Sequence, residues 1–134
     1  ELPVGREVYD GTDLRILRSV RFQVVEKFLT DNCSFDKKNI YTKCFDCDKI
    51  KGTLVLRFRQ EGDVITVCSD GKKRKLKKEF IDRKVPKDIR DSLLLLAEAD
   101  RVLWAIGLRR GQDYLVEDVT KRVLMVSLEF QEEK

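Results

Sequence analysis

The 134-residue sequence contains no histidine, only two prolines, and no glycine loop of the kind that binds phosphate. Without histidine, the chain lacks the commonest general base, the Ser-His and Cys-His nucleophile pairs and most zinc sites. Gly71 precedes a lysine, but no second glycine stands at P-loop spacing. No apolar run is long enough to cross a membrane, and no signal-peptide pattern is present. We therefore expect no catalytic residue, no cofactor and no membrane partner for these residues.

Cysteine is also scarce, with four residues in the chain. This number does not make a disulfide scaffold at this length, and reduced thiols in the cytoplasm are the simpler interpretation. Cys44 and Cys47 form a CxxC pair, whereas Cys33 and Cys68 stand alone. Closed zinc sites usually have two close-spaced pairs, so we predict no metal site. A metal-dependent nucleic-acid module remains a third alternative for function.

Charge is what the sequence has in abundance, since 39% of its residues are charged against about a quarter in typical globular chains. The stretch 71–90 holds ten lysines and arginines and three acids, a local charge of +7, whereas the whole chain carries only +4. Two interpretations are open. The run is either a solvated helix face or a surface that binds phosphates, where each neutralised phosphate releases a counterion.

The apolar pattern predicts an α+β fold of layered, mostly antiparallel β-sheets with one or two short helices. Asp10-Gly11 predicts the turn of a hairpin over 4–28, and the polar residues 30–39 predict a loop. In the strand predicted at 53–59, Arg57 and Arg59 share one face. Further strands are predicted at 40–45, 63–67, 93–96, 101–107 and 121–130. Trp104 and Phe80 are predicted to pack in the core rather than to stack on bases.

One helix is predicted over Lys75–Lys84, where Leu76, Phe80 and Ile81 fall at helical spacing. Pro86 ends this helix and suits the first position of a second short one. Cations crowd the first turn of the predicted helix, where the macrodipole disfavours positive charge. This arrangement is locally unfavourable, which favours the phosphate-binding interpretation, and the amide ends of the helix would add to it.

Four segments of the sequence carry a resemblance: "RFRQEGD", "KLKKEFIDRKVPKDIRD", "VLWAIGLR" and "TKRVL", in that order. Together they resemble the C-terminal domain of the bacterial tRNA(Ile)-lysidine synthetase family, over about 53–128. Upstream, "FDCDKI" resembles the family's Phe-Asp-Tyr-Asp-Lys segment. The sequence departs from the family at Phe58, where Asn is usual, and in the loop 64–74.

The resemblance implies a fold similar to a module in the β subunit of phenylalanyl-tRNA synthetase. It also implies two domains, a β-rich segment at 1–52 that links to the rest of a parent enzyme and a substrate-binding domain at 53–134. Such enzymes use ATP to join lysine to the wobble cytidine of a minor isoleucine tRNA. ATP and Mg²⁺ belong to an N-terminal catalytic domain with a Ser-Gly-Gly-x-Asp-Ser loop, and these 134 residues contain no such loop.

The partners implied are the minor isoleucine tRNA, held at its acceptor stem, the protein's own catalytic domain and a second copy in a homodimer, all in the cytoplasm. The predicted tRNA contacts are Arg57, Arg59, Lys72, Lys73, Arg74, Lys75, Lys77, Lys78, Arg83, Lys84, Arg90 and Arg109. The main alternative is a non-catalytic interaction or dimerisation module that packs on its own catalytic domain.

Overall fold

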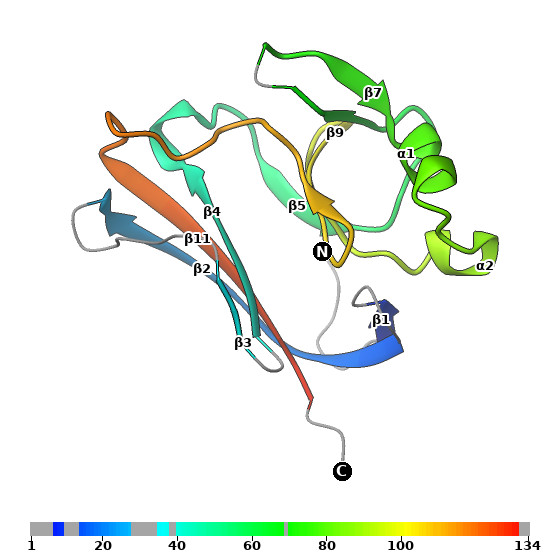
Figure 1. The fold of residues 1–134 in the computed structure, drawn as a ribbon. Helices are drawn as coiled ribbons and strands as arrows, with labels where there is room; N and C mark the ends of the chain where they lie inside the picture. Colours follow the sequence, from blue (N-terminus) through cyan, green and yellow to red (C-terminus); the bar gives the residue numbers. More distant parts are fainter. Residues whose placement is uncertain (1–6, 10–13, 28–34, 38–39, 69, 132–134) are drawn as a thin grey trace. The chain divides into compact units, whose positions relative to one another are not determined.

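The computed structural model describes residues 7–9, 14–27, 35–37, 40–68 and 70–131 (Figure 1). Their contacts divide the chain into two compact units. Unit 1 contains Glu7–Arg15 and Gly52–Asp113, and unit 2 contains Ile16–Lys51 and Tyr114–Lys134. The change at residue 52 lies beside the predicted domain boundary. The chain then returns to unit 2 at Tyr114, because its last strand completes the sheet of that unit.

Unit 2 is built around an antiparallel sheet in which the last strand lies between two earlier ones. The order is β1-β2-β11-β4-β3, and β1 itself belongs to unit 1. The pairs of β11 with β2 and with β4 are antiparallel, as is the pair of β3 with β4. The strands are β1 (Glu7–Tyr9), β2 (Leu14–Glu26), β3 (Phe35–Lys37), β4 (Ile40–Asp46) and β11 (Arg122–Phe130), and a 3-10 turn, η2 (Cys47–Lys49), follows β4.

Unit 1 contains the second sheet, in the order β5-β8-β9-β6-β7, with β10 paired to β9. All pairs in it are antiparallel except β6 with β9. The strands are β5 (Leu54–Arg57), β6 (Val64–Thr66), β7 (Lys73–Lys75), β8 (Leu95–Glu98), β9 (Arg101–Ala105) and β10 (Arg109–Arg110). Two helices, α1 (Leu76–Asp82) and α2 (Lys87–Arg90), lie between β7 and β8 in the chain. The predicted α+β class, with mostly antiparallel sheets and two short helices, is confirmed.

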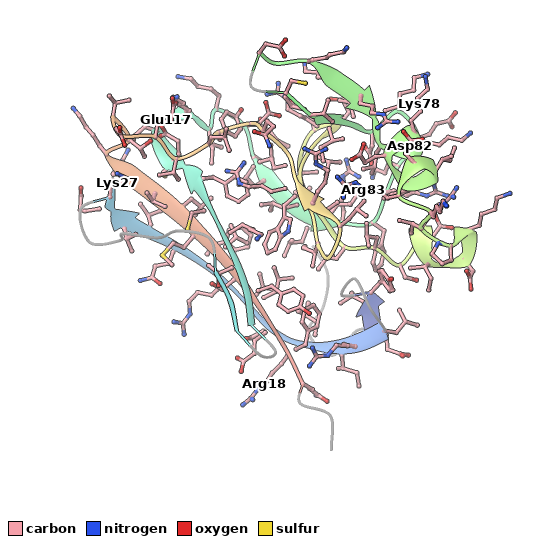
Figure 2. The ribbon with its side chains drawn as sticks, viewed as in Figure 1. Arg18, Lys27, Lys78, Asp82, Arg83 and Glu117 are labelled. Atoms are coloured by element: carbon pink, nitrogen blue, oxygen red, sulfur yellow. The ribbon has the colours of Figure 1, made fainter. Side chains whose placement is uncertain are left out.

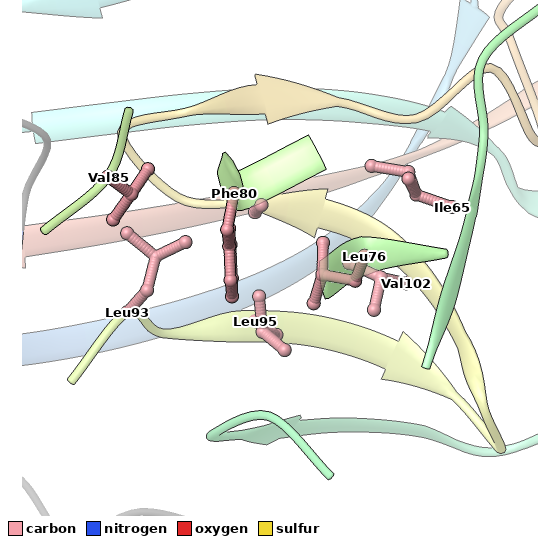
Figure 3. Packing of buried hydrophobic residues seen from close by; sticks show 8 residues of the cluster. Ile65, Leu76, Phe80, Val85, Leu93, Leu95 and Val102 are labelled. Atoms are coloured by element: carbon pink, nitrogen blue, oxygen red, sulfur yellow. The ribbon is translucent and has the colours of Figure 1, made fainter. Parts of the chain in front are cut away.

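The core of unit 1 forms where α1 packs against the sheet (Figure 3). Leu76 and Phe80 point from the helix towards Ile65, Leu95 and Val102, and all five side chains are buried. The predicted burial of Phe80 and Trp104 is therefore confirmed. This packing fixes the position and direction of α1 on the sheet. It thereby also fixes where the basic residues that flank the helix lie.

The prediction that Ile81 anchors the helix is wrong, because its side chain is 51% exposed. Ile81 follows Leu76 by five residues, which places it about 140° around the helix from Leu76. The helix is also shorter than the predicted 75–84. It begins at Leu76 because Lys75 is extended, with φ −63° and ψ 133°. It ends at Asp82, since Lys84 has a φ of +57°.

The end of α1 is a Schellman motif, in which a residue of left-handed conformation closes the helix. Lys84 N–H donates to the carbonyl of Ile81 at 3.1 Å, and Val85 N–H donates to the carbonyl of Phe80 at 3.0 Å. Val85 and Phe80 are both in the core. The left-handed position, where glycine is usual, is held by a lysine.

Three further differences concern strands. Residues Lys73–Lys75 form β7, where a loop up to residue 74 and the start of the helix at Lys75 were predicted, and Phe35–Lys37 form β3 within the predicted loop 30–39. β5 ends at Arg57, so Arg59 lies beyond the strand and the two arginines do not share a strand face as predicted.

The predicted turn at Asp10-Gly11 lies outside the described residues. Among the helices that the structure describes, none is long and apolar enough to cross a membrane.

Candidate nucleic-acid interface

The centre of the basic region is a buried acid, Glu79, whose side chain is 2% exposed. Three arginines from three places in unit 1 donate to it. Arg74 on β7 donates to Oε2 at 2.9 Å, Arg83 at the end of α1 donates to Oε1 at 2.9 Å, and Arg109 on β10 donates to Oε1 at 3.1 Å. These four residues are called the Glu79 cluster. Arg74 also pairs with Asp82 one turn along α1.

Two opposing effects act on the pKa of Glu79. Burial alone raises the pKa, because the charged form loses solvation. The hydrogen bonds from Arg109 and Arg83, together with their positive charge, outweigh burial, so the pKa lies below its usual value. Glu79 is therefore ionised at neutral pH and ties β7, β10 and the end of α1 together. Sequence reasoning counted Glu79 only as an opposing charge and missed this role.

A second buried ion pair holds Arg57, whose side chain is only 13% exposed. Its two terminal nitrogens donate to the two oxygens of Asp63 at 2.9 and 2.8 Å, a bidentate geometry suited to a guanidinium. The same nitrogens also donate to the carbonyls of Phe58 and Ala99. Arg57 therefore holds the turn between β5 and β6 in place. It stays a predicted tRNA contact, but its donors are directed at the protein.

Arg59 and Arg90 are held less completely. Arg59 Nε donates to Asp91 Oδ1 at 2.7 Å, and its guanidinium lies 5.8 Å from the centre of the Phe80 ring. Arg90 Nε donates to the carbonyl of Val85 at 2.9 Å. Among the described residues, the terminal nitrogens of both arginines have no hydrogen-bond partner. These nitrogens are free to bind a ligand.

The lysines of the same region have entirely different surroundings. All are exposed, and their amines have no hydrogen bond or ion pair within the described part of the chain. Five of them extend from the loop before β7 to the first turn of α1 and are called the lysine surface: Lys72, Lys73, Lys75, Lys77 and Lys78. Figure 2 labels Lys78 on α1, together with Asp82 and Arg83 at the end of the helix. The other two, Lys84 and Lys87, lie beyond the end of α1.

Two open depressions border the lysine surface. One, of about 520 Å³, has cations and no acid in its lining, which is Val67, Cys68, Lys72, Lys73, Arg74, Lys75 and Lys78. The other, of about 610 Å³, mixes Arg59, Lys75 and Lys77 with three acids, Glu61, Asp63 and Asp91. The first depression is therefore the better site for an anion. Lys75 borders both.

The start of α1 differs from the prediction. The helix has only seven residues, and the N–H of Leu76 donates to the carbonyl of Asp63 at 2.9 Å. Lys77 and Lys78 lie in its first turn, whereas Lys73–Lys75 belong to strand β7. That strand is the last in its sheet, a place where lysines are common because they discourage edge pairing.

Of the three cysteines that the structure describes, only Cys68 lies in unit 1. Cys44 is buried in β4 and Cys47 is half-buried after it, both in unit 2, whereas Cys68 is exposed in unit 1. Within the described ranges, no group of three or more Cys, Asp or Glu residues is placed to hold a metal ion.

Comparison with known proteins places this chain in a family. The family model of the TilS substrate C-terminal domain matches residues 54–127, more than half of the chain. A tRNA(Ile)-lysidine synthase from Clostridium tetani is 36% identical over 96 residues, covering 72% of this chain and 21% of that protein. The enzyme of the same name from Thermotoga maritima is 50% identical over 70 residues, covering 52% of this chain and 16% of that protein.

A crystal structure of a TilS C-terminal domain has the same fold, with a TM-score of 0.67 and 23% sequence identity over 99% of this chain and 96% of that one. The chain spans about a fifth of the length of the curated relatives that it matches. The matched range contains the Glu79 cluster and the whole lysine surface. The chain belongs to the TilS substrate C-terminal domain family.

Proposed function

We propose that this chain is the tRNA-binding region of a tRNA(Ile)-lysidine synthase, and that the lysine surface contacts the tRNA backbone. The observation that supports this most directly is the set of five exposed lysines whose amines have no acid partner within the described residues. Amines in this state exchange water and counterions for phosphates without first breaking an ion pair.

The chemistry of the surface suits a double-stranded RNA better than a base-reading site. A-form RNA is recognised mostly through its shape, its phosphates and its 2′-hydroxyls. Recognition of single strands relies on exposed aromatic rings that stack on bases. The lysine surface and the linings of the two depressions contain no aromatic residue. We therefore assign the lysine surface to a helical part of the minor isoleucine tRNA, and the acceptor stem is our candidate.

The arginines take a different part in this proposal. Those of the Glu79 cluster shape the surface, whereas the free nitrogens of Arg59 and Arg90 extend it. The parent enzyme, acting in the cytoplasm, would join lysine to the tRNA in its catalytic domain, where ATP and Mg²⁺ would also bind. This chain would hold the tRNA and pack beside that domain.

Replacing Lys75, Lys77 and Lys78 with alanine tests the proposal. If each lysine neutralises one phosphate, the variant binds minor isoleucine tRNA on the order of 100-fold more weakly at 0.1 M salt. The slope of log K against log salt becomes shallower by roughly 2 to 3. Both quantities are measured by fluorescence anisotropy of labelled tRNA over a series of salt concentrations.

The matched control removes three other exposed lysines, Lys51, Lys87 and Lys121, which lie outside both depressions. Both variants lose three positive charges, so a general charge effect weakens binding equally in the two. An equal loss would contradict the assignment of the lysine surface. Unchanged binding in the first variant would support a module that contacts only protein.

A further inference from the structure

The larger of the two depressions beside the lysine surface has a lining of mixed charge. Its cations and acids are equal in number: Arg59, Lys75 and Lys77 against Glu61, Asp63 and Asp91. The smaller depression has cations and no acid. A phosphate offers only acceptors and needs only cations around it. The mixed lining therefore suits a ligand that presents a hydrogen-bond donor close to a negative charge.

The three acids of this depression differ in how far their oxygens are already occupied. Asp63 is 3% exposed, and its two oxygens accept from the two terminal nitrogens of Arg57. Asp91 accepts from Arg59 Nε at 2.7 Å. Glu61 is exposed, and its carboxylate has no hydrogen bond or ion pair to any residue that the structure describes. Glu61 is therefore the acid with both oxygens available to a ligand.

The turn that carries Glu61 is well held. Gly62 has a φ of +90°, a conformation that favours glycine. Gln60 N–H donates to Asp63 Oδ2 at 2.8 Å, and Asp63 N–H donates to the carbonyl of Gln60 at 3.3 Å. The N–H of Leu76 donates to the carbonyl of Asp63 at 2.9 Å, which joins the turn to the first residue of α1. Glu61 is thus fixed in the same depression as two members of the lysine surface.

We propose that Glu61 accepts a hydrogen bond from a ribose 2′-hydroxyl of the bound RNA, while the cations of the same depression hold a neighbouring phosphate. The proposal rests on the tRNA binding proposed above and adds a selection for RNA over DNA. A hydroxyl donates well to a carboxylate, and A-form RNA displays its 2′-hydroxyls in a wide, shallow minor groove.

The lysines alone do not supply this selection. Their attraction is to phosphate charge, which RNA and DNA share. A free carboxylate repels both backbones, but only ribose offsets the repulsion with a hydrogen bond. An unpaired charge that one ligand satisfies and its competitor does not is a common source of specificity. The competing possibility is that Glu61 is an ordinary exposed acid that repels every polyanion equally.

Two RNA hairpins of the same sequence test the proposal, one with ribose and one with 2′-fluoro sugars. Both are A-form and carry the same charge, but the fluorinated sugar has no O–H to donate. We expect the unmodified chain to bind the ribose hairpin about fivefold more tightly at 0.1 M salt, as for an exposed hydrogen bond to a charged acceptor. In Glu61→Ala the preference should fall below about twofold. The change in protein charge cancels in this ratio, which fluorescence anisotropy measures.

The matched control is Asp118→Ala, which removes an exposed acid of unit 2 outside both depressions. It should keep the fivefold preference, and circular dichroism verifies that both variants fold. Equal binding of the two hairpins by the unmodified chain overturns the proposal. A preference that Glu61→Ala leaves unchanged overturns it too.

The variant without Lys75, Lys77 and Lys78 separates this proposal from the one on which it rests. If that variant binds RNA as tightly as the unmodified chain, the lysine surface is not the binding site and both proposals fail. If it loses binding while the unmodified chain does not distinguish the two hairpins, the lysine surface stands and only the role of Glu61 is overturned.

Discussion

The arginines and the lysines of unit 1 carry the same charge on the same short elements, yet their surroundings are opposite. Arg74 is joined to the buried Glu79, whereas its strand neighbours Lys73 and Lys75 extend into solvent without a partner among the described residues. A guanidinium presents several donors in a fixed plane that fits a carboxylate, and an ammonium is a strongly hydrated point charge. In this part of unit 1 the arginines of the Glu79 cluster serve internal structure, and the lysines beside them are the residues that we propose to contact a ligand.

Of the substitutions that test this contrast, Glu79→Ala should have the largest effect on stability. This change leaves three arginines without their shared partner and should lower the free energy of unfolding by about 3 kcal/mol. That value is the low end for a broken buried ion pair, because the arginines keep access to solvent. Urea denaturation at pH 7 measures it. Glu61→Ala, which removes an exposed acid nearby, should change stability by less than about 0.5 kcal/mol.

Two cations of the α1 region give the next contrast. Arg83→Ala removes one of three donors to Glu79 and should cost about 1 kcal/mol of stability. Lys78→Ala should leave stability within about 0.5 kcal/mol of the original, yet weaken tRNA binding about sixfold at 0.1 M salt. Urea denaturation measures the stability of both variants, and fluorescence anisotropy measures their binding of tRNA. If Lys78→Ala lowers stability and Arg83→Ala does not, the two roles are assigned the wrong way round.

The pH dependence of stability should reveal the same cluster. The pKa of Glu79 is lower in the folded chain than its usual value, so the unfolded chain takes up the proton first as pH falls. The stabilisation is complete above the usual carboxyl pKa of about 4.3, and it is lost as pH falls through the lower, folded value. The stability difference between the unmodified chain and Glu79→Gln should therefore shrink below about pH 4. A constant difference from pH 7 to pH 3 would contradict this.

Patterns along the chain predicted the elements of this fold well, because alternation and helical spacing record which side chains face a core. The strand at 121–130 and the burial of Leu76 and Phe80 follow directly from such spacing. The role of Glu79 does not, because a buried acid is recognisable only once residues 74, 83 and 109 are near it in space. Likewise β7 pairs with β6 through a sequence that reads as a charged loop. The basic stretch was predictable as a region, but its division into structural arginines and free lysines depends on tertiary contacts.

The smallest expected effect concerns Lys84, a lysine in the left-handed position that closes α1. A side chain in this conformation is strained by about 1 kcal/mol or more, and glycine is not. Lys84→Gly should therefore raise the free energy of unfolding by about 0.5 kcal/mol, after the greater flexibility of unfolded glycine is counted. Lys84→Ala loses the same charge but keeps the strain, so it should leave stability nearly unchanged. Both variants should weaken tRNA binding by the same small factor if Lys84 contacts a phosphate. A stabilised glycine variant with unchanged tRNA binding would instead remove Lys84 from the interface.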